Sequence, residues 1–173
     1  LKEDPARHLL IVGDGPELDR LKTLAASLGV SEAVHFLGLR TDVPDLLADA
    51  DLFVLASRAE GLTLAVVEAM AAELAVVVTD VGGHKEVVTP DTGWIVPPED
   101  VPALRSAVAV ALADPPAARA RGAAGRRLAV AGFSLTGQVE AQYGLFARAH
   151  EASRRGKMPR PSRPGVEAKR RFA

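Results

Sequence analysis

The sequence contains no cysteine, and this absence removes several kinds of chemistry at once. Without cysteine, the 173-residue chain has no disulfide framework, no thiol nucleophile and no cysteine-based metal site. The four histidines are scattered along the chain without the spacing of metal ligands, so we expect no metal site. They are His8, His35, His84 and His150.

Long apolar segments and targeting signals are lacking as well. No apolar run approaches the roughly 20 residues that span a bilayer. The first residues, LKEDPARH, do not have the pattern of a secretory signal peptide. The composition is that of an ordinary globular protein, with 48% hydrophobic and 25% charged residues, and the length suits one domain with a sizeable core. These features favour a cytoplasmic protein.

The net charge of −1 conceals a basic carboxyl-terminal segment. Residues 151–173 contain eight lysine and arginine residues and two glutamates, a net charge of +6, which leaves −7 for residues 1–150. Because this segment is also rich in proline and poor in apolar residues, we predict a disordered tail over residues 151–173. Two interpretations of this segment stay open. It is a solubilising or merely tolerated terminus, or it contacts anionic lipid head groups or a polyanionic substrate.

Strand-like and helix-like segments alternate along residues 1–150. Short apolar runs that end at glycine or a polar residue are typical of buried parallel strands, and apolar residues at helical spacing follow them. The predicted strands are 8–13, 33–38, 51–56, 74–80 and 92–98. The predicted helices are 16–29, 42–50, 62–72, 84–88, 99–114, 116–132 and 134–152. This alternation predicts an α/β fold with a doubly wound parallel sheet, whose ligand crevice lies at the carboxyl ends of the strands.

The predicted strand ends carry residues suited to such a crevice. Glycine, acidic and hydroxyl residues gather in the segments 13–16, 38–42, 57–62 and 79–83. Glycine also ends strands for steric reasons alone, so these segments favour a site without requiring one.

The first of these segments has part of a dinucleotide-binding fingerprint. Gly13 and Gly15 match its first two glycines, but Leu18 stands at the third position and no acidic residue ends the next strand in the right place. A nicotinamide or flavin dehydrogenase is therefore disfavoured, and the segment is interpreted as a tight turn from strand to helix.

Glu60 and Glu68, with seven residues between them, are the most informative pair in the chain. Their segment follows a predicted strand and opens a predicted helix, so it places a carboxylate, a glycine and free backbone N–H groups at the mouth of the crevice. Such a place suits a phosphorylated sugar ligand. The alternative from spacing alone is that Glu60 is only an acidic residue of a first helical turn and Glu68 a solvated carboxylate.

Five segments, taken in order and spacing, resemble a known family. They are LLIVGDGPELDRLKTLAASLG, VHFLG, DLFVLASRAEGLTLAVVEAMAA, VVVTDVGGHKEVV and TGWIVPPED. Over residues 7–150 the chain resembles the carboxyl-terminal, donor-binding domain of the GT-B retaining glycosyltransferases with the E-x7-E motif, the glycosyl transferases of group 1. The resemblance implies a Rossmann-like fold over residues 1–150 that is incomplete at its amino-terminal edge, because the family begins this domain with one more strand and a basic pair that grips the diphosphate.

The resemblance implies a role for each matching residue. Glu60 is the implied catalytic residue, next to the hydroxyls of the donor sugar, and Glu68 is implied to bind the ribose hydroxyls of the nucleotide. Further implied donor-binding residues lie in the crevice, in the loop after the second strand and at the start of the third helix: Gly13, Asp14, Leu39, Arg40, Asp42, Gly61, Leu62, Thr63 and Leu64. No cofactor and no metal are expected, since the nucleotide-sugar is a substrate.

The function implied is the donor-binding half of an enzyme that transfers a sugar from a UDP- or GDP-sugar to an acceptor with retention of the anomeric configuration. The chain alone is expected to be inactive, because the family's acceptor-binding domain has no counterpart in it. The implied partners are the nucleotide-sugar, an amino-terminal acceptor domain or partner chain, and an anionic surface at the cytoplasmic face of the membrane, but no nucleic acid. Two alternatives stay open: a non-catalytic nucleotide-sugar-binding subunit, and a degenerate relative kept for interactions.

One departure from the family predicts local strain. Glu73 stands where the family has a glycine that ends the helix in a left-handed conformation. A residue with a Cβ atom costs on the order of 1 kcal/mol there.

Overall fold

The computed structural model describes Leu1, Asp4, residues 6–61 and residues 64–154. The predicted site residues Leu62 and Thr63 lie outside the described residues, as do residues 155–173 of the predicted tail. Residues 151–154, the start of that predicted tail, are helical instead of disordered because they continue the helix Leu135–Arg154.

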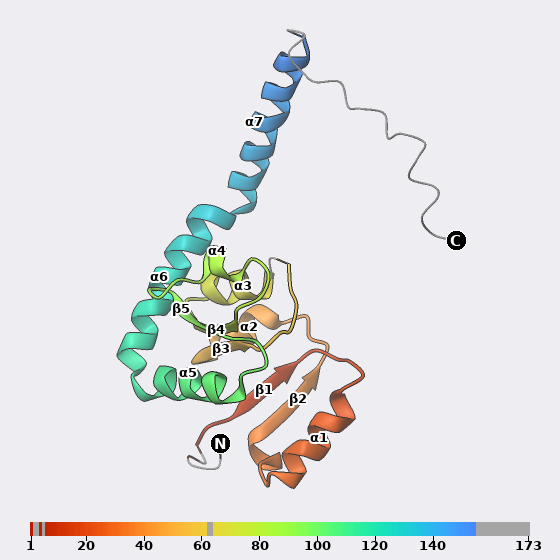
Figure 1. Ribbon diagram of the computed structural model, residues 1–173, viewed down its shortest axis with the longest axis vertical. Helices are drawn as coiled ribbons and strands as arrows, with labels where there is room; N and C mark the ends of the chain where they lie inside the picture. Colours follow the sequence, from red (N-terminus) through yellow and green to blue (C-terminus); the bar gives the residue numbers. More distant parts are fainter. Residues whose placement is uncertain (2–3, 5, 62–63, 155–173) are drawn as a thin grey trace, which may run out of the picture.

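A three-stranded parallel sheet forms the centre of the larger part of the molecule (Figure 1). Its strands are β3 (Leu52–Leu55), β4 (Ala75–Thr79) and β5 (Gly93–Val96), paired in the order β3-β4-β5. Every residue of β4 is buried, as expected for a run of β-branched residues that is covered on both faces. The carboxyl ends of these strands therefore meet at one edge of the sheet.

Helices cover both faces of this sheet. The covering helices are α3 (Leu64–Ala71), α5 (Val101–Ala113) and α6 (Pro115–Phe133). Alternation along β4 sends Val76 and Val78 into a core cluster with α3 and α6, whereas Val77 packs in a second cluster with α5. The result is a three-layer arrangement in which the sheet is the middle layer.

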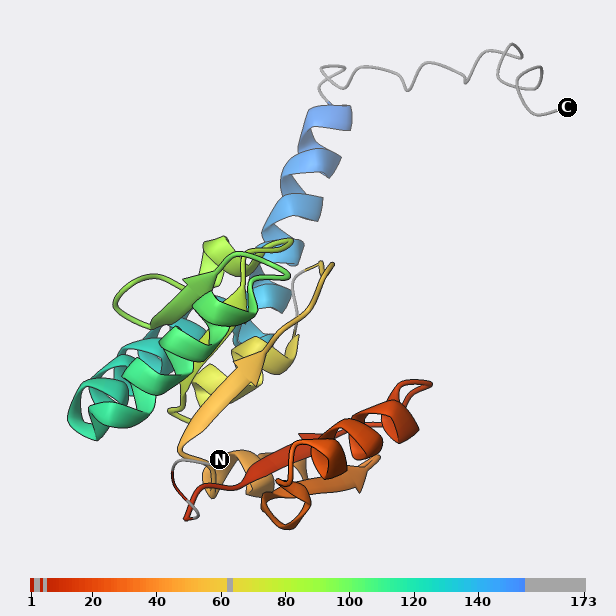
Figure 2. The same ribbon diagram turned by 60° about the horizontal axis from the view of Figure 1, so that its bottom comes forward.

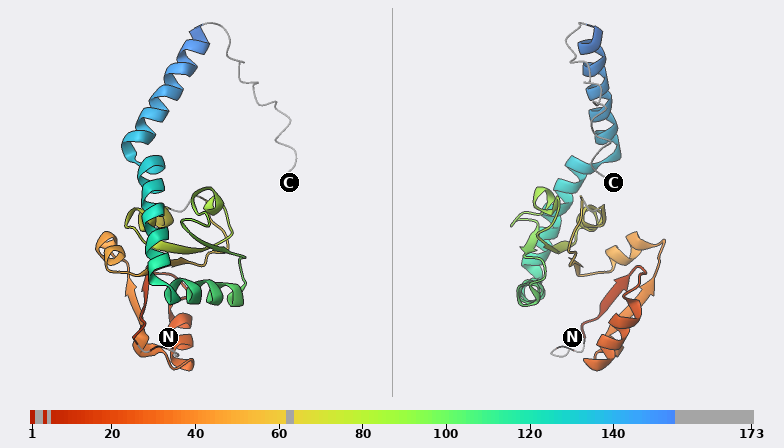
Figure 3. Two further views of the ribbon diagram at one scale, coloured as in Figure 1. Left: turned by 90° about the vertical axis from the view of Figure 1, so that its left-hand side faces the viewer. Right: turned by 45° about the vertical axis from the view of Figure 1, so that its right-hand side comes forward.

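A smaller parallel sheet lies towards the amino terminus. It contains β1 (Leu9–Val12) and β2 (Val34–Gly38), joined through α1 (Leu18–Ser27) and the short 3-10 helix η1 (Ser31–Ala33). Figures 2 and 3 show β1, α1 and β2 grouped together, apart from the strands β3 to β5. Helix α2 (Val43–Ala48) lies in the connection to β3, and its Leu47 packs against the core of the larger part.

The predicted α/β class with parallel strands is confirmed, but the strands are divided between two sheets. Within the described residues β1 pairs only with β2 and β3 only with β4. In a doubly wound sheet with strand order 3-2-1-4-5-6, these two sheets match positions 3-2 and 4-5-6, so position 1 has no strand in the part of the chain described. The position without a strand therefore lies between β1 and β3, inside this strand order. In agreement, Leu9, Leu10 and Val12 of β1 are 41%, 44% and 43% exposed.

The remaining helices are α4 (His84–Val87), after β4, and α7 (Leu135–Arg154), which continues the chain beyond α6 and projects away from the rest of the domain (Figure 3). Capping aspartates begin two of the long helices: Asp100 accepts a hydrogen bond from Ala103 N at 2.9 Å, and Asp114 accepts one from Ala117 N at 3.0 Å. None of the helices that the structure describes combines the length and the apolar character needed to cross a membrane.

Candidate functional site

Glu60 lies in the loop from β3 to α3, at the carboxyl edge of the larger sheet. Its carboxylate atom Oε1 accepts a hydrogen bond from Ser57 Oγ at 2.7 Å. The carbonyl of Ser57 in turn accepts a hydrogen bond from Thr79 Oγ1, at the end of β4, at 2.6 Å. The loop is therefore tied to the neighbouring strand, and the Glu60 carboxylate is oriented from that side.

The start of α3 gathers the other predicted residues of this region. Gly61 and Leu64 are exposed at the entry to the helix, and Glu68 is exposed one turn further along it. A helix start offers backbone N–H groups without intrahelical partners, together with a partial positive charge. The region thus combines two carboxylates, which can accept hydrogen bonds from hydroxyl groups, with donors that suit an anionic group.

The ends of β1 and β2 bring together a second group of predicted residues. Gly13 N donates a hydrogen bond to Gly38 O at 2.7 Å, with Gly13 at a φ of 122° that favours glycine. Asp14 follows at once and accepts a hydrogen bond from Gly15 N at 2.8 Å. Leu39, next after Gly38, is exposed at the same edge.

Arg40 and Asp42 form an ion pair in the loop after β2. Arg40 Nε donates to Asp42 Oδ1 at 2.8 Å, and a second nitrogen of the same guanidinium donates to Oδ2. The hydrogen bond from Arg40 holds the pKa of the Asp42 carboxyl below its ordinary value, and the same bond raises the pKa of Arg40. Asp42 is the N-cap residue of α2, but its carboxylate binds Arg40 instead of capping the helix.

The structure therefore divides the predicted site residues between two groups at the carboxyl ends of two sheets. The first group, at β1 and β2, contains Gly13, Asp14, Leu39, Arg40 and Asp42. The second, at β3 and α3, contains Glu60, Gly61, Leu64 and Glu68. The described residues hold no group of three or more histidine, aspartate or glutamate side chains arranged for a metal ion.

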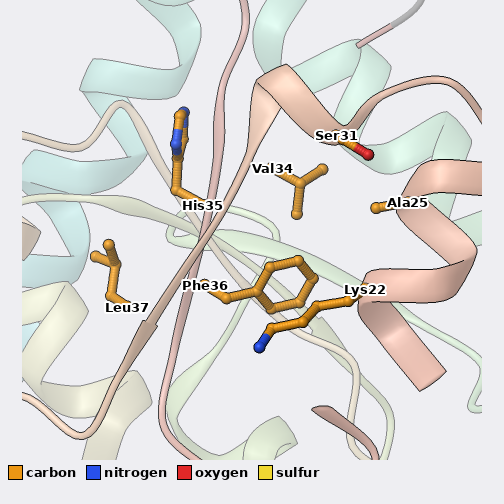
Figure 4. Close-up of a pocket in the computed structure, with 7 residues that line it drawn as sticks. All are labelled: Lys22, Ala25, Ser31, Val34, His35, Phe36 and Leu37. Carbon is orange, nitrogen blue, oxygen red and sulfur yellow. The ribbon is translucent and has the colours of Figure 1, made fainter. Parts of the chain in front are cut away.

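A cavity of about 500 Å³ lies elsewhere, between α1, η1 and β2. Figure 4 shows Val34 and Phe36 of β2 turned towards Lys22 and Ala25 of α1, while His35 points to the other side of the strand. The lining on the α1 side is mostly apolar and belongs to the contact between helix and strand. It offers no convergent polar groups, so it does not compete with the strand ends as a site.

Sequence reasoning missed the buried side of the Glu60 loop. Thr79 and His84 are both buried, and Gly83 N donates a hydrogen bond to Gly61 O at 3.1 Å. The only signal in the sequence was the glycine pair after a buried strand, which by itself predicts a turn and gives no indication of what the turn contacts.

Comparison with protein families gives a match over most of the chain. The family described as "Glycosyl transferases group 1" matches residues 1–128. The lipopolysaccharide core biosynthesis mannosyltransferase LpsB of Rhizobium meliloti is 35% identical over 133 residues, which cover 73% of this chain and 38% of LpsB. A GDP-mannose-dependent alpha-(1-6)-phosphatidylinositol monomannoside mannosyltransferase of Mycolicibacterium smegmatis is 40% identical over 136 residues, 73% of this chain and 36% of the relative.

Solved structures show the same likeness. Sucrose-phosphate synthase from Thermosynechococcus elongatus superposes with a TM-score of 0.76 at 32% identity, covering 84% of this chain and 39% of that structure. Alr3699/HepE of Anabaena, solved in complex with UDP-glucose, gives 0.75 at 26% identity, over 84% of this chain and 42% of that structure. The chain thus spans about two fifths of the length of each of these four relatives.

Proposed function

The chain belongs to the group 1 glycosyltransferases, and we propose that residues 1–150 form the donor-binding half of such an enzyme, which transfers a sugar from a nucleotide-sugar with retention of the anomeric configuration. The observation that carries the proposal is the placement of Glu60 and Glu68 around the start of α3, at the carboxyl edge of a parallel sheet. This is the edge at which α/β sheets bind their ligands.

The donor is a nucleoside diphosphate sugar in this proposal. Glu68, exposed on α3, accepts hydrogen bonds from the ribose hydroxyls, and Glu60 accepts them from the hydroxyls of the sugar. The N–H groups at the start of α3 face the diphosphate. Support comes from the UDP-glucose complex of Alr3699/HepE and from the GDP-mannose dependence of the Mycolicibacterium relative.

The chemical step proposed is a front-face substitution. The bond from the anomeric carbon to the diphosphate oxygen breaks, the acceptor oxygen bonds to the same face of that carbon, and the acceptor's proton passes to the leaving phosphate oxygen. The protein positions the donor and stabilises the developing charge, without a side-chain nucleophile. We propose further that binding requires no metal and no cofactor.

Transfer also requires an acceptor site. Because the chain spans about two fifths of its relatives, we propose that this site is supplied by an acceptor-binding domain or a separate chain, and that the 173 residues alone bind the donor but transfer little or no sugar. Transfer that appears only when the acceptor-binding half is supplied would support this view. Efficient transfer by the 173-residue chain alone would contradict it, and the anomeric proton coupling of the product reports retention.

Calorimetry on the isolated chain tests the donor site directly. We expect binding of UDP or GDP that persists in EDTA, and we expect Glu68→Ala to weaken it by about 1–3 kcal/mol, because the ribose hydroxyls lose a charged acceptor. Glu140→Ala is the matched control, since Glu140 is an exposed glutamate on α7. Equal affinity of the wild type and Glu68→Ala would overturn the assignment.

The basic tail has a separate proposed role as a contact for an anionic membrane at the cytoplasmic face. Each lysine or arginine near such a surface contributes roughly 1 kcal/mol over a Debye length of about 8 Å at physiological salt. Binding to anionic vesicles is then clear at low salt, fades at high salt and vanishes in a chain that ends at Ala152. Co-sedimentation in which the full and shortened chains bind equally, or in which neither binds at low salt, would leave the tail as a solvated terminus only.

A further inference from the structure

We propose that the turn after β4, residues 80–83, together with the buried side chains on either side of it, positions Glu60 for the donor sugar. The inference rests on the proposed function of Glu60 and assigns the positioning of that residue to an element outside the E-x7-E segment. We call residues 80–83 the β4–α4 turn.

Gly82 brings the backbone of this turn directly against Glu60. Its φ is +53°, and a Cβ atom added there would lie 2.0 Å from Glu60 O and 2.5 Å from Gly61 O. Backbone atoms cannot yield as the end of a flexible side chain can, so any side chain at residue 82 displaces the peptide that follows Glu60. Glycine is therefore required both by the conformation and by the close approach.

Hydrogen bonds fix the same segment at both of its ends. On one side, Gly83 N donates to Gly61 O at 3.1 Å. On the other side, Thr79 Oγ1 donates to Ser57 O at 2.6 Å, and Ser57 Oγ donates to the Glu60 carboxylate at 2.7 Å. The segment 57–61 is thus held against the end of β4 and against the turn that follows it.

His84 closes the turn from inside the protein. Its side chain is 0% exposed, and Nδ1 lies 2.8 Å from Thr79 O. Because a carbonyl oxygen can only accept, Nδ1 carries the hydrogen and donates it. This bond joins the first residue of α4 to the last residue of β4 and so sets the shape of the turn between them. Thr79 is only 3% exposed and takes part in both interactions. Its hydroxyl donates a hydrogen bond to the Glu60 loop, and its carbonyl accepts one from His84.

The arrangement predicts which part of the donor is affected when the turn is disturbed. In the proposed site Glu60 accepts hydrogen bonds from the sugar, and Glu68 accepts them from the ribose of the nucleotide. A displaced Glu60 segment weakens binding of the intact nucleotide-sugar but spares the nucleotide alone. A general loss of folding would instead weaken both, so the comparison of UDP-glucose with UDP, or of GDP-mannose with GDP, separates positioning from folding.

Two pairs of variants supply the test. Thr79→Val removes the hydroxyl at nearly constant volume, whereas Thr79→Ser keeps a hydroxyl at the same position. His84→Leu removes the Nδ1 donor, whereas His84→Asn provides an amide N–H in its place. We expect Thr79→Val and His84→Leu to weaken UDP-glucose or GDP-mannose binding about tenfold, the loss of one to two hydrogen bonds, and to change UDP or GDP binding less than about twofold. We expect Thr79→Ser and His84→Asn to recover most of the loss. Gly132→Ala, at a site with open space, is the control that leaves both affinities unchanged.

Amide hydrogen exchange of Gly83 gives a second readout that does not depend on any ligand. The Gly83 N–H is bonded to Gly61 O, so we expect it to be protected in the wild type and to lose protection in Gly82→Ala and His84→Leu, with the Glu60 and Gly61 resonances moving together. If the wild type binds neither nucleotide-sugar, the proposed function fails, but this exchange pattern still decides whether the turn holds the segment. A freely exchanging Gly83 amide in the wild type, equal loss of nucleotide and nucleotide-sugar binding, or absence of rescue by Thr79→Ser and His84→Asn would overturn the inference.

Discussion

Glu73 lies just after α3 and has a φ of 69°, in the left-handed region that favours glycine. The helix closes with two hydrogen bonds, from Leu74 N to Ala69 O at 3.1 Å and from Glu73 N to Met70 O at 3.0 Å. These are the two bonds of a Schellman ending, which requires the left-handed conformation at residue 73. The left-handed helix end predicted from the sequence is thereby confirmed, whereas the energetic cost of a non-glycine residue there stays a prediction.

Replacing Glu73 by glycine removes the Cβ atom that disfavours the left-handed conformation. We expect Glu73→Gly to raise the free energy of unfolding by about 1 kcal/mol, because glycine adopts the left-handed conformation without the Cβ penalty. Urea unfolding followed by circular dichroism measures the change. Glu73→Ala is the control, since it removes the carboxylate but keeps the Cβ atom. If the glycine variant is no more stable than the alanine variant, strain at this residue is negligible.

The ion pair between Arg40 and Asp42 predicts a local titration. In Arg40→Gln we expect the pKa of the Asp42 carboxyl to rise towards its ordinary value, because the hydrogen bond from the guanidinium is what lowers it. A folded pKa below the unfolded one stabilises the fold above the unfolded pKa, and this contribution is lost as the pH falls through the folded pKa. The pH range in which this contribution to stability is lost is therefore acidic, below about pH 4.

Carboxyl-carbon NMR titration of Asp42 measures this shift. Arg20→Gln breaks an exposed ion pair with Glu17 on another part of the chain and serves as the matched control. An Asp42 midpoint that is the same in the wild type and in Arg40→Gln would show that the pair does not persist in solution.

Helix α6 approaches α3 and the residues just after it through two glycines. A Cβ atom on Gly122 would lie 2.0 Å from Glu73 O, and one on Gly125 would lie 3.4 Å from Met70 Cγ. The first contact is with backbone and the second is with a flexible side chain. Gly122 is therefore the position at which the spacing of the two helices is fixed.

Gly122→Ala tests this spacing. We expect a loss of about 1–3 kcal/mol in the free energy of unfolding, because the two helices must move apart and the core around Met70 loosens. Thermal or urea unfolding measures it. Gly132→Ala on the same helix has open space around it, and we expect no loss there, because alanine favours the helix. Equal effects of the two substitutions would show that the helix contact is not tight.

The helices and strands themselves were predictable because their signals are local. Short apolar runs, apolar residues at helical spacing and glycines located each predicted element to within a few residues, and among the elements of the described residues only η1 was not anticipated. Strand pairing was not predictable in the same way. Whether β1 lies next to β3 depends on contacts between distant segments. The sequences LLIV of β1 and LFVL of β3 contain no local pattern that indicates which strand pairs with each edge. The role of the β4–α4 turn was hidden for the same reason, since Gly82 meets Glu60 only in the folded chain.

The two open sheets leave four strand edges without a neighbouring strand in the part of the chain that the structure describes, one each on β1, β2, β3 and β5. In the strand order 3-2-1-4-5-6, the edges of β1 and β3 are the two that would border a strand at position 1. Both strands are apolar, and Val54 in the middle of β3 is 37% exposed. Unpaired backbone groups beside exposed apolar side chains are a template for pairing with another chain.

This geometry predicts that the 173-residue chain associates as its concentration rises. A lysine at an edge strand opposes such pairing, because its charge cannot be buried between two sheets. We therefore expect Val54→Lys to lower the average mass measured by sedimentation at high concentration. Val110→Lys is the matched control, since Val110 is 53% exposed but lies on helix α5, and we expect it to leave the association unchanged. If both substitutions reduce the association equally, its cause is exposed apolar surface in general and not the strand edges. If the chain stays monomeric at every concentration, the two edges are closed in solution.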